Sequence, residues 1–213
     1  MKKNLLLMEK GSEIRSAIQE LSLLKAEGLI STKPFLNVCN MVLQVLDKIG
    51  PTMAVLRQDV CQNIQRLEEL YQMDPSIYAN LADIVKKEVE EKSAKKALSC
   101  TRALLWLTRS LDFTVALLDK IARDPSQSLA KVVEISYDNT LKPWHGWISS
   151  AAYKVALKLV PDNKTFISIL LAEEEECSML KEEIQSLVSL LLPLLDEIHK
   201  IMEAFCLDSL KST

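Results

Sequence analysis

The chain has 213 residues, a formal net charge of −3 and 48% hydrophobic residues. This length fits one domain with a large core, and the weakly acidic balance, without a basic stripe, argues against a nucleic-acid-binding protein. The chain contains only 4 Gly and 7 Pro, and its apolar residues recur at helical spacing and do not alternate. An all-α fold is therefore predicted.

The first half of the chain is predicted to form four helices and part of a fifth. Residues 12–25 read as an amphipathic helix within an N-terminal extension, residues 1–30, packed on a single domain that spans residues 1–213. A second helix begins at the Ser31-Thr32 cap and runs to about residue 49, where Gly50-Pro51 ends it. Further helices are expected over residues 53–72, from Pro75 through the charged run Lys86–Lys96, and over residues 98–123.

The second half is predicted to form four further elements, which brings the sandwich to about eight helices besides the extension. They are a helix over residues 127–141, one from near Pro143 to Pro161, a short one over 163–172, and a long one over 174–205 that contains Pro193. No stretch of about 18 uncharged apolar residues occurs, so no transmembrane helix is predicted.

The cysteines indicate reduced thiols in a cytoplasmic protein. Their number is odd, their spacings are wide and no C-x-x-C pair occurs, which argues against a disulfide framework and a metal site. They are Cys39, Cys61, Cys100, Cys177 and Cys206. No cofactor is expected, and the absence of known catalytic motifs argues against an enzyme.

Two helical segments carry polar side chains at matching spacing. Asp59, Asn63 and Arg66 follow an i, i+4, i+7 pattern, which places an acceptor, an amide and a cation on one helix face. A solvated face is the simpler interpretation. Arg102 and Trp106 stand at i, i+4. The Trp ring could stack on a sugar, or it could be a core side chain with Arg102 extending outward.

The segment Trp144-His145-Gly146-Trp147 places two of the three tryptophans around one of the two histidines. Trp rings favour the boundary between water and lipid, and a single His can donate one hydrogen bond. No second His or Cys cluster is near enough in sequence to indicate a metal site. His199, in the last predicted helix, is expected to be structural.

Together these segments resemble the glycolipid transfer protein family. The resemblance is carried by Asp59–Arg66, Cys100–Leu111 and Lys142–Trp147, and it extends from about Lys33 to near the end of the chain. It implies a two-layer helical sandwich that holds one sphingolipid and transfers it between membranes without enzymatic activity. The headgroup would lie at a surface site, and the ceramide chains would lie in an apolar pocket between the layers.

The resemblance also implies roles for individual residues. Asp59 would accept a hydrogen bond from the ceramide amide and His145 would donate one to its carbonyl. Asn63 and Arg66 would bind headgroup oxygens, and Trp106 would stack on the first sugar. The apolar pocket would include Phe35, Val42, Leu46 and Phe113. Membrane contact would involve Trp147, with Trp144 or Tyr153 and the nearby Lys154 and Lys158, although Trp147 could instead pack under the site.

Arg102 departs from the sugar-binding pattern, because an Arg at this place is typical of family members that bind ceramide-1-phosphate. Glycosphingolipid cargo is the main prediction. The alternative is a carrier or sensor of a phosphate-containing sphingolipid, either ceramide-1-phosphate or an inositol-phosphate-linked glycosphingolipid. Alternatively, Arg102 pairs a neighbouring carboxylate. A helical protein-interaction module without lipid is a further possibility, and no protein partner is identified.

Overall fold

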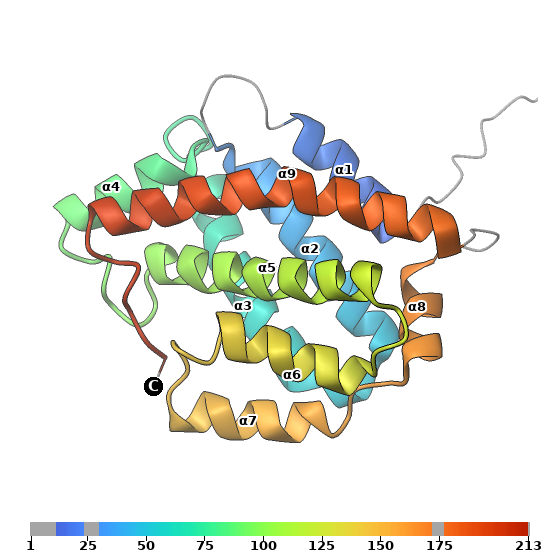
Figure 1. The fold of residues 1–213 in the computed structure, drawn as a ribbon. Helices are drawn as coiled ribbons and strands as arrows, with labels where there is room; N and C mark the ends of the chain where they lie inside the picture. Colours follow the sequence, from blue (N-terminus) through green and yellow to red (C-terminus); the bar gives the residue numbers. More distant parts are fainter. Residues whose placement is uncertain (1–11, 24–29, 172–176, 213) are drawn as a thin grey trace, which may run out of the picture.

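The computed structural model describes residues 12–23, 30–171 and 177–212, and these residues form nine α-helices and one 3-10 helix (Figure 1). The predicted all-α class is confirmed. The elements are α1 (Glu13–Leu23), α2 (Thr32–Ile49), η1 (Pro51–Met53), α3 (Ala54–Met73), α4 (Leu81–Glu90), α5 (Cys100–Arg123), α6 (Leu129–Thr140), α7 (Trp147–Leu157), α8 (Asn163–Leu170) and α9 (Cys177–Ala204).

The helices form two layers, and α5 lies at the centre of the front layer. In Figure 1 the front layer consists of α9, α5, α6 and α7, which lie one below the other, with α4 packed against α5 and α9. Behind them lie α1, α2 and α3, of which α2 contacts both α1 and α3 while α3 contacts α5. The predicted two-layer helical sandwich is thereby confirmed. The core lies where α3 and α2 meet α5 and α9.

Local sequence explains where the central helices begin and end. The Ser99 side chain accepts a hydrogen bond from the Arg102 backbone N–H and caps α5, which satisfies an N–H that the helix leaves unpaired. Gly50 ends α2 with φ of 99°. A side chain is strained in that region of backbone space, so glycine there permits the turn from α2 into η1.

Two predicted helices have bounds that were wrong. The fourth helix begins at Leu81 behind an Asn80 cap and ends at Glu90, so only the first five residues of the charged run Lys86–Lys96 are helical. Residues 141–146 are not α-helical, and α7 begins at Trp147 and not near Pro143. This second correction matters for the site, because it places His145 on a turn between two helices.

The predicted N-terminal extension contains α1, which packs against α2 and α9. Its first residues are bound to α9, since Ser12 and Arg15 both donate hydrogen bonds to the Glu183 carboxylate. Residues 1–11 and 24–29 of the extension lie outside the described residues. Within the described ranges, no helix has the length and apolar character needed to cross a bilayer.

Candidate ligand-binding site

The polar group on α3 is linked by hydrogen bonds. The Asn63 amide donates to the Asp59 backbone carbonyl at 3.0 Å, and its side-chain oxygen accepts from Arg66 at 3.1 Å. Asn63 is only 6% exposed, so a fully solvated face is the wrong interpretation for this residue. Asp59 is exposed. Partial desolvation raises the pKa of its carboxyl group, and the charge of Arg66 opposes that rise.

Helices α3 and α5 run antiparallel and bring their polar faces to the same level. The Cys100 Sγ lies 3.5 Å from the Arg66 carbonyl oxygen. Near the other end of the α3 group, Val60 faces Leu107 and Ser110 across a narrow hollow. Position 63 therefore lies midway between these two points of contact, opposite about Leu104, which is two residues before Trp106.

Aromatic side chains from two helices, α5 and α6, lie beside His145. Its ring centroid lies 5.6 Å from that of Trp106 and 5.5 Å from that of Tyr137. Its Nδ1 lies 3.2 Å from the Tyr137 hydroxyl. Burial, together with the charge of Arg109, lowers the pKa of His145, so the ring is neutral at pH 7 and carries a single N–H.

Arg109 lies in the site but was not predicted as a site residue from the sequence. Its guanidinium lies between two indole rings, with centroids 4.9 Å away for Trp106 and 4.2 Å away for Trp144. The residue is 1% exposed and its Nε has no hydrogen-bond partner among the described residues. Burial lowers its pKa to about 10. The available signal was its place four residues after Leu105, on the buried face of α5.

A segment after α9, residues 208–212, crosses this site and is called the strap below. In Figure 1 it descends in red past the start of α5 toward the turn that precedes α7. The Arg102 Nη2 donates to the Lys211 carbonyl at 2.9 Å. Arg109 donates to the carbonyls of Leu210, at 2.7 Å, and Asp208. The alternative that Arg102 pairs a neighbouring carboxylate was wrong, since its described partner is a backbone oxygen.

The far end of the strap is bound to the turn that carries His145. The Ser212 N–H donates to the Trp144 carbonyl at 2.9 Å. Its hydroxyl accepts from the Gly146 N–H at 2.8 Å and lies 3.0 Å from the Ser149 hydroxyl. The strap thus connects the cations of α5 with the turn that positions the histidine.

His199 holds the near end of the strap, in keeping with its expected structural role. Its Nε2 lies 2.8 Å from the Asp112 carboxylate of α5, and its Nδ1 lies 2.7 Å from the Asp208 carboxylate. These two hydrogen bonds raise the pKa of His199 to about 9 despite its partial burial. The imidazolium therefore joins α9, α5 and the strap at neutral pH.

The predicted pocket residues lie in a tightly packed region between the layers. Phe35 is fully buried, and Val42, Leu46 and Phe113 are half-buried and packed against the core. A hollow between α2, α3 and α5, lined in part by Val42 and Leu107, is too narrow to hold a water molecule. The predicted pocket residues thus lie at or beside the interlayer core, and the hollow beside Val42 is closed.

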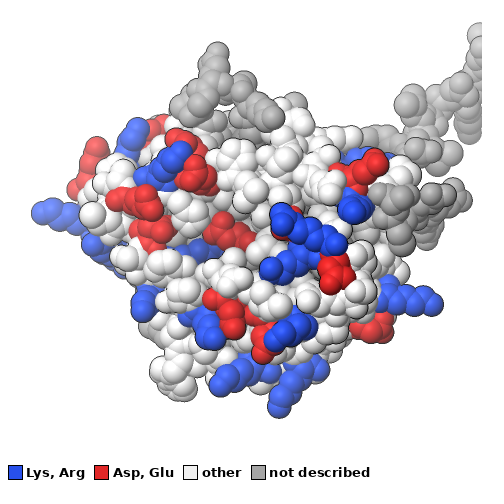
Figure 2. Space-filling view, in the orientation of Figure 1, with Lys and Arg blue, Asp and Glu red and all other residues white. Residues whose placement is uncertain are grey.

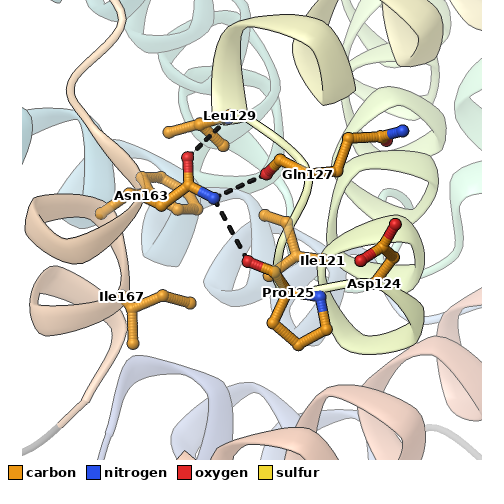
Figure 3. Close-up of a pocket in the computed structure, with 8 residues that line it drawn as sticks. Ile121, Asp124, Pro125, Gln127, Leu129, Asn163 and Ile167 are labelled. Atoms are coloured by element: carbon orange, nitrogen blue, oxygen red, sulfur yellow. Dashed lines mark hydrogen bonds between the residues drawn. The ribbon is translucent and has the colours of Figure 1, made fainter.

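A second hollow lies at the opposite end of α5, beside Ile121 (Figure 3). The Asn163 side chain crosses it and donates to the Gln127 carbonyl at 2.6 Å, while its oxygen accepts from the Leu129 N–H. Nineteen residues of helix separate Ile121 from Arg102, and a helix rises about 1.5 Å per residue. This hollow is an interhelical joint remote from the polar site.

The predicted membrane-contact residues lie in two different environments. Trp147 is 80% exposed, which rules out the alternative that it packs under the site. Trp144 covers Arg109, and Tyr153 stacks on Tyr137 with ring centroids 3.4 Å apart. The Tyr153 hydroxyl is buried. Trp144 and Tyr153 therefore face the site, contrary to a role as freely exposed membrane anchors.

The surface around Trp147 is both apolar and basic. Ile148 is 52% and Val155 61% exposed on the same helix, α7, and Lys154 and Lys158 are exposed beside them. Figure 2 shows basic side chains along the lower edge of the molecule, over α7, whereas both charge signs are mixed elsewhere on this face. No group of side chains suited to a metal ion occurs among the described residues.

Comparisons with known proteins place these features in context. The family model described as glycolipid transfer protein matches residues 30–172. Glycolipid transfer protein 3 of Arabidopsis thaliana is 52% identical, over 96% of this chain and 94% of the relative.

Solved structures share the architecture. The GLTP-fold structure that describes how FAPP2 selects simple glycosphingolipids superposes with a TM-score of 0.84 at 26% identity, covering 95% of this chain and 100% of that one. Human ceramide-1-phosphate transfer protein in complex with 12:0 ceramide-1-phosphate gives a TM-score of 0.83 at 16% identity, over 93% and 99% of the two chains.

Proposed function

The chain belongs to the glycolipid transfer protein family, and from this premise we propose that it transfers single glycosphingolipid molecules between membranes without changing them chemically. The supporting observation is the convergence of two helices and a turn. The segment of α3 that carries the polar group packs along the first half of α5, which carries Trp106, and the Trp106 ring lies 5.6 Å from His145. These elements supply an acceptor, several donors and a flat aromatic surface.

The amide of a ceramide supplies one hydrogen-bond donor and one acceptor, and the site offers an acceptor for the first and a donor for the second. A carboxylate only accepts hydrogen bonds, so Asp59 binds the amide N–H. The neutral His145 ring binds the amide carbonyl through Nε2–H when the Tyr137 hydroxyl donates to Nδ1. A glycerolipid has esters at this place and would leave Asp59 without a donor, at a cost of roughly 1–3 kcal/mol.

The headgroup is bound by the remaining polar side chains. Asn63 and Arg66, which are bonded to each other, exchange that bond for contacts with sugar hydroxyls. Trp106 offers a half-buried indole to the apolar face of the first sugar. These contacts determine the specificity for the headgroup. The lipid chains contribute affinity, at about 0.8 kcal/mol per buried CH₂ relative to water.

Exchange with a bilayer takes place through α7. Trp147 and Ile148 enter the interface while Lys154 and Lys158 meet lipid phosphates. Such contact is weak and reversible, as a carrier requires, and it makes the protein peripheral at cytoplasmic membrane surfaces. The helices α2, α3 and α5, which close the interlayer hollow, part as the ceramide chains enter.

A vesicle-to-vesicle transfer assay with galactosylceramide and a phosphatidylcholine tests the proposal. The wild-type chain moves the first lipid and not the second. Asp59→Ala loses transfer at least tenfold, because the amide N–H has no acceptor. Glu69→Ala removes another exposed carboxylate of α3 and serves as the matched control. Absence of galactosylceramide transfer by the wild type, or equal rates for both variants, would contradict the assignment.

The same assay separates a carrier from a sensor and from an interaction module. A sensor binds the sphingolipid without moving it between vesicles. A module with a permanently filled core binds no lipid, and native mass spectrometry of the purified protein would then show the bare mass alone.

A second candidate cargo is a phosphate-containing sphingolipid, and Arg102 is the observation that favours it. Its guanidinium is bonded to the Lys211 carbonyl and to no described carboxylate. Arginine pairs phosphate oxygens through two parallel bonds, whereas neutral hexoses need no such cation. Arg102→Leu should reduce transfer of ceramide-1-phosphate severalfold and leave galactosylceramide transfer unchanged. Unchanged ceramide-1-phosphate transfer would end this hypothesis.

A further inference from the structure

The strap occupies donors at the proposed headgroup site. Lys211 places its carbonyl oxygen on Arg102, and Leu210 places its own on Arg109. Ser212 takes the Gly146 N–H, next to His145. Oxygen acceptors are also what a sphingolipid headgroup presents to a protein. The strap and a headgroup therefore compete for the same hydrogen bonds.

The two ends of the strap are held with different strength. At the near end, the Asp208 carboxylate binds the His199 imidazolium and the Asp208 carbonyl binds Arg109, while Leu207 is buried in the core. At the far end, Ser212 makes bonds between uncharged groups, and the exposed Lys211 is held by one bond from Arg102 to its backbone carbonyl. The far end can leave the site while Asp208 stays in place.

The charges around the strap favour an anion as its replacement. Arg102, Arg109 and His199 carry three positive charges, and Asp112 and Asp208 are the two carboxylates that act on this group. A phosphate at Arg102 adds a negative charge and can pair the guanidinium through two parallel bonds, whereas the Lys211 carbonyl is an uncharged acceptor that makes one. A sugar hydroxyl at the same place would only replace the Lys211 carbonyl by another uncharged acceptor of the Arg102 hydrogen bond.

We propose that residues 211–212 form a displaceable substitute for the headgroup, which a phosphate-bearing sphingolipid expels from Arg102 and a neutral glycosphingolipid leaves in place. The strap then sets headgroup preference in addition to the residues that contact lipid. This inference rests on the proposed transfer function, because it assumes that a sphingolipid enters this site. Release of Ser212 also frees the turn at Gly146, which couples headgroup charge to the position of His145.

Hydrogen exchange read by mass spectrometry tests the displacement. The Ser212 N–H is bonded to the Trp144 carbonyl and the Leu210 N–H to the Leu207 carbonyl, so a peptide covering residues 205–213 reports on the strap. The protein is mixed with phosphatidylcholine vesicles that contain ceramide-1-phosphate, galactosylceramide or neither. We expect faster exchange in this peptide with ceramide-1-phosphate only. Equal protection in all three mixtures, with ceramide-1-phosphate bound, would overturn the proposal.

A truncated variant that ends at Leu210 as a C-terminal amide, which adds no carboxylate beside Arg109, tests the competition directly. Without residues 211–213 it should bind ceramide-1-phosphate about tenfold more tightly, which is what one or two net hydrogen bonds are worth. Galactosylceramide binding should change less than twofold. Lys211→Ala is the matched control, because it removes the side chain and keeps the backbone carbonyl on Arg102. Equal ceramide-1-phosphate affinity of the truncated variant and wild type would overturn the proposal.

Ser212→Ala supports the same test if the truncated variant unfolds. It removes the bonds of the Ser212 hydroxyl to Gly146 and Ser149, and it should tighten ceramide-1-phosphate binding about threefold. An unchanged affinity for this variant would count against the proposal. Failure of both lipids to bind the wild type would overturn the proposed function and this inference together. Binding of both lipids with a fully protected strap would overturn the inference alone.

Discussion

Replacing His199 by glutamine should remove a pH-dependent part of the stability of the fold. Asp112 and Asp208 face the imidazole from α5 and from the strap, and Arg109 lies near both carboxylates. The pKa of His199 is about 9 against 6.5 without these neighbours. At 1.36 kcal/mol for each pH unit between the two values, protonated His199 contributes roughly 3 kcal/mol.

The sign of the pH dependence follows from the raised pKa. The contribution is fully present below pH 6.5 and is lost as the pH rises through 9, because the folded protein then releases the proton that holds the two carboxylates. Urea unfolding of the wild type should therefore show a free energy of unfolding roughly 3 kcal/mol lower at pH 9.5 than at pH 6. For His199→Gln the value should be low at pH 6 and nearly constant. The same slope in both proteins would refute the reasoning.

Three further substitutions test other parts of the site. Trp147→Ala should reduce vesicle partitioning roughly tenfold and alter the free energy of unfolding by less than about 0.5 kcal/mol, measured by co-sedimentation and urea melts. Tyr137→Phe keeps the ring and removes the hydroxyl that contacts His145 and Ser150, so galactosylceramide transfer should fall roughly 3–10-fold while the free energy of unfolding falls by no more than about 1.5 kcal/mol. Arg109→Lys should lower the free energy of unfolding by roughly 2–4 kcal/mol, because the paired carbonyl bonds are charge-assisted and the contact with Trp106 is lost.

The helices were largely predictable because their signals are local. The apolar spacing and the Gly50-Pro51 break located α2, and the spacing of Asp59, Asn63 and Arg66 correctly placed three polar side chains on one face of α3. The start of α7 was misplaced, because Pro at the first position of a helix is a common signal. Here Pro143 instead lies in a turn that ends at Gly146.

Contacts between distant segments were beyond sequence reasoning. The i, i+4 spacing related Arg102 to Trp106, but neither spacing nor composition indicates that residues about a hundred positions later cross this helix. Arg109 was hidden for a similar reason, since its indole and carbonyl partners come from the turn before α7 and from the strap. Tyr153 appeared suited to a membrane surface, yet its ring stacks on Tyr137.

The closed interior bears on how a lipid can be carried. An unfilled apolar cavity costs about 24 cal/mol per Å³, so a void of several hundred Å³ would cost on the order of 10 kcal/mol. Native domains have roughly 5–15 kcal/mol of stability in total. An empty apolar cavity of that size would consume much of this stability, and the tight packing of Val42 against α3 and α5 avoids that cost.

The space between the layers must then open only as the lipid chains enter it, which restricts where the protein can take up its lipid. In a bilayer the lipid chains are already removed from water, so their transfer into the protein gains little of the roughly 0.8 kcal/mol per CH₂ that burial from water provides. The free energy that drives extraction must come largely from the headgroup contacts of Asp59, His145 and their neighbours. An exposed anchor such as Trp147 keeps the protein at the interface while the chains pass directly from lipid to core. Weakening the headgroup contacts should consequently slow extraction more than it slows release.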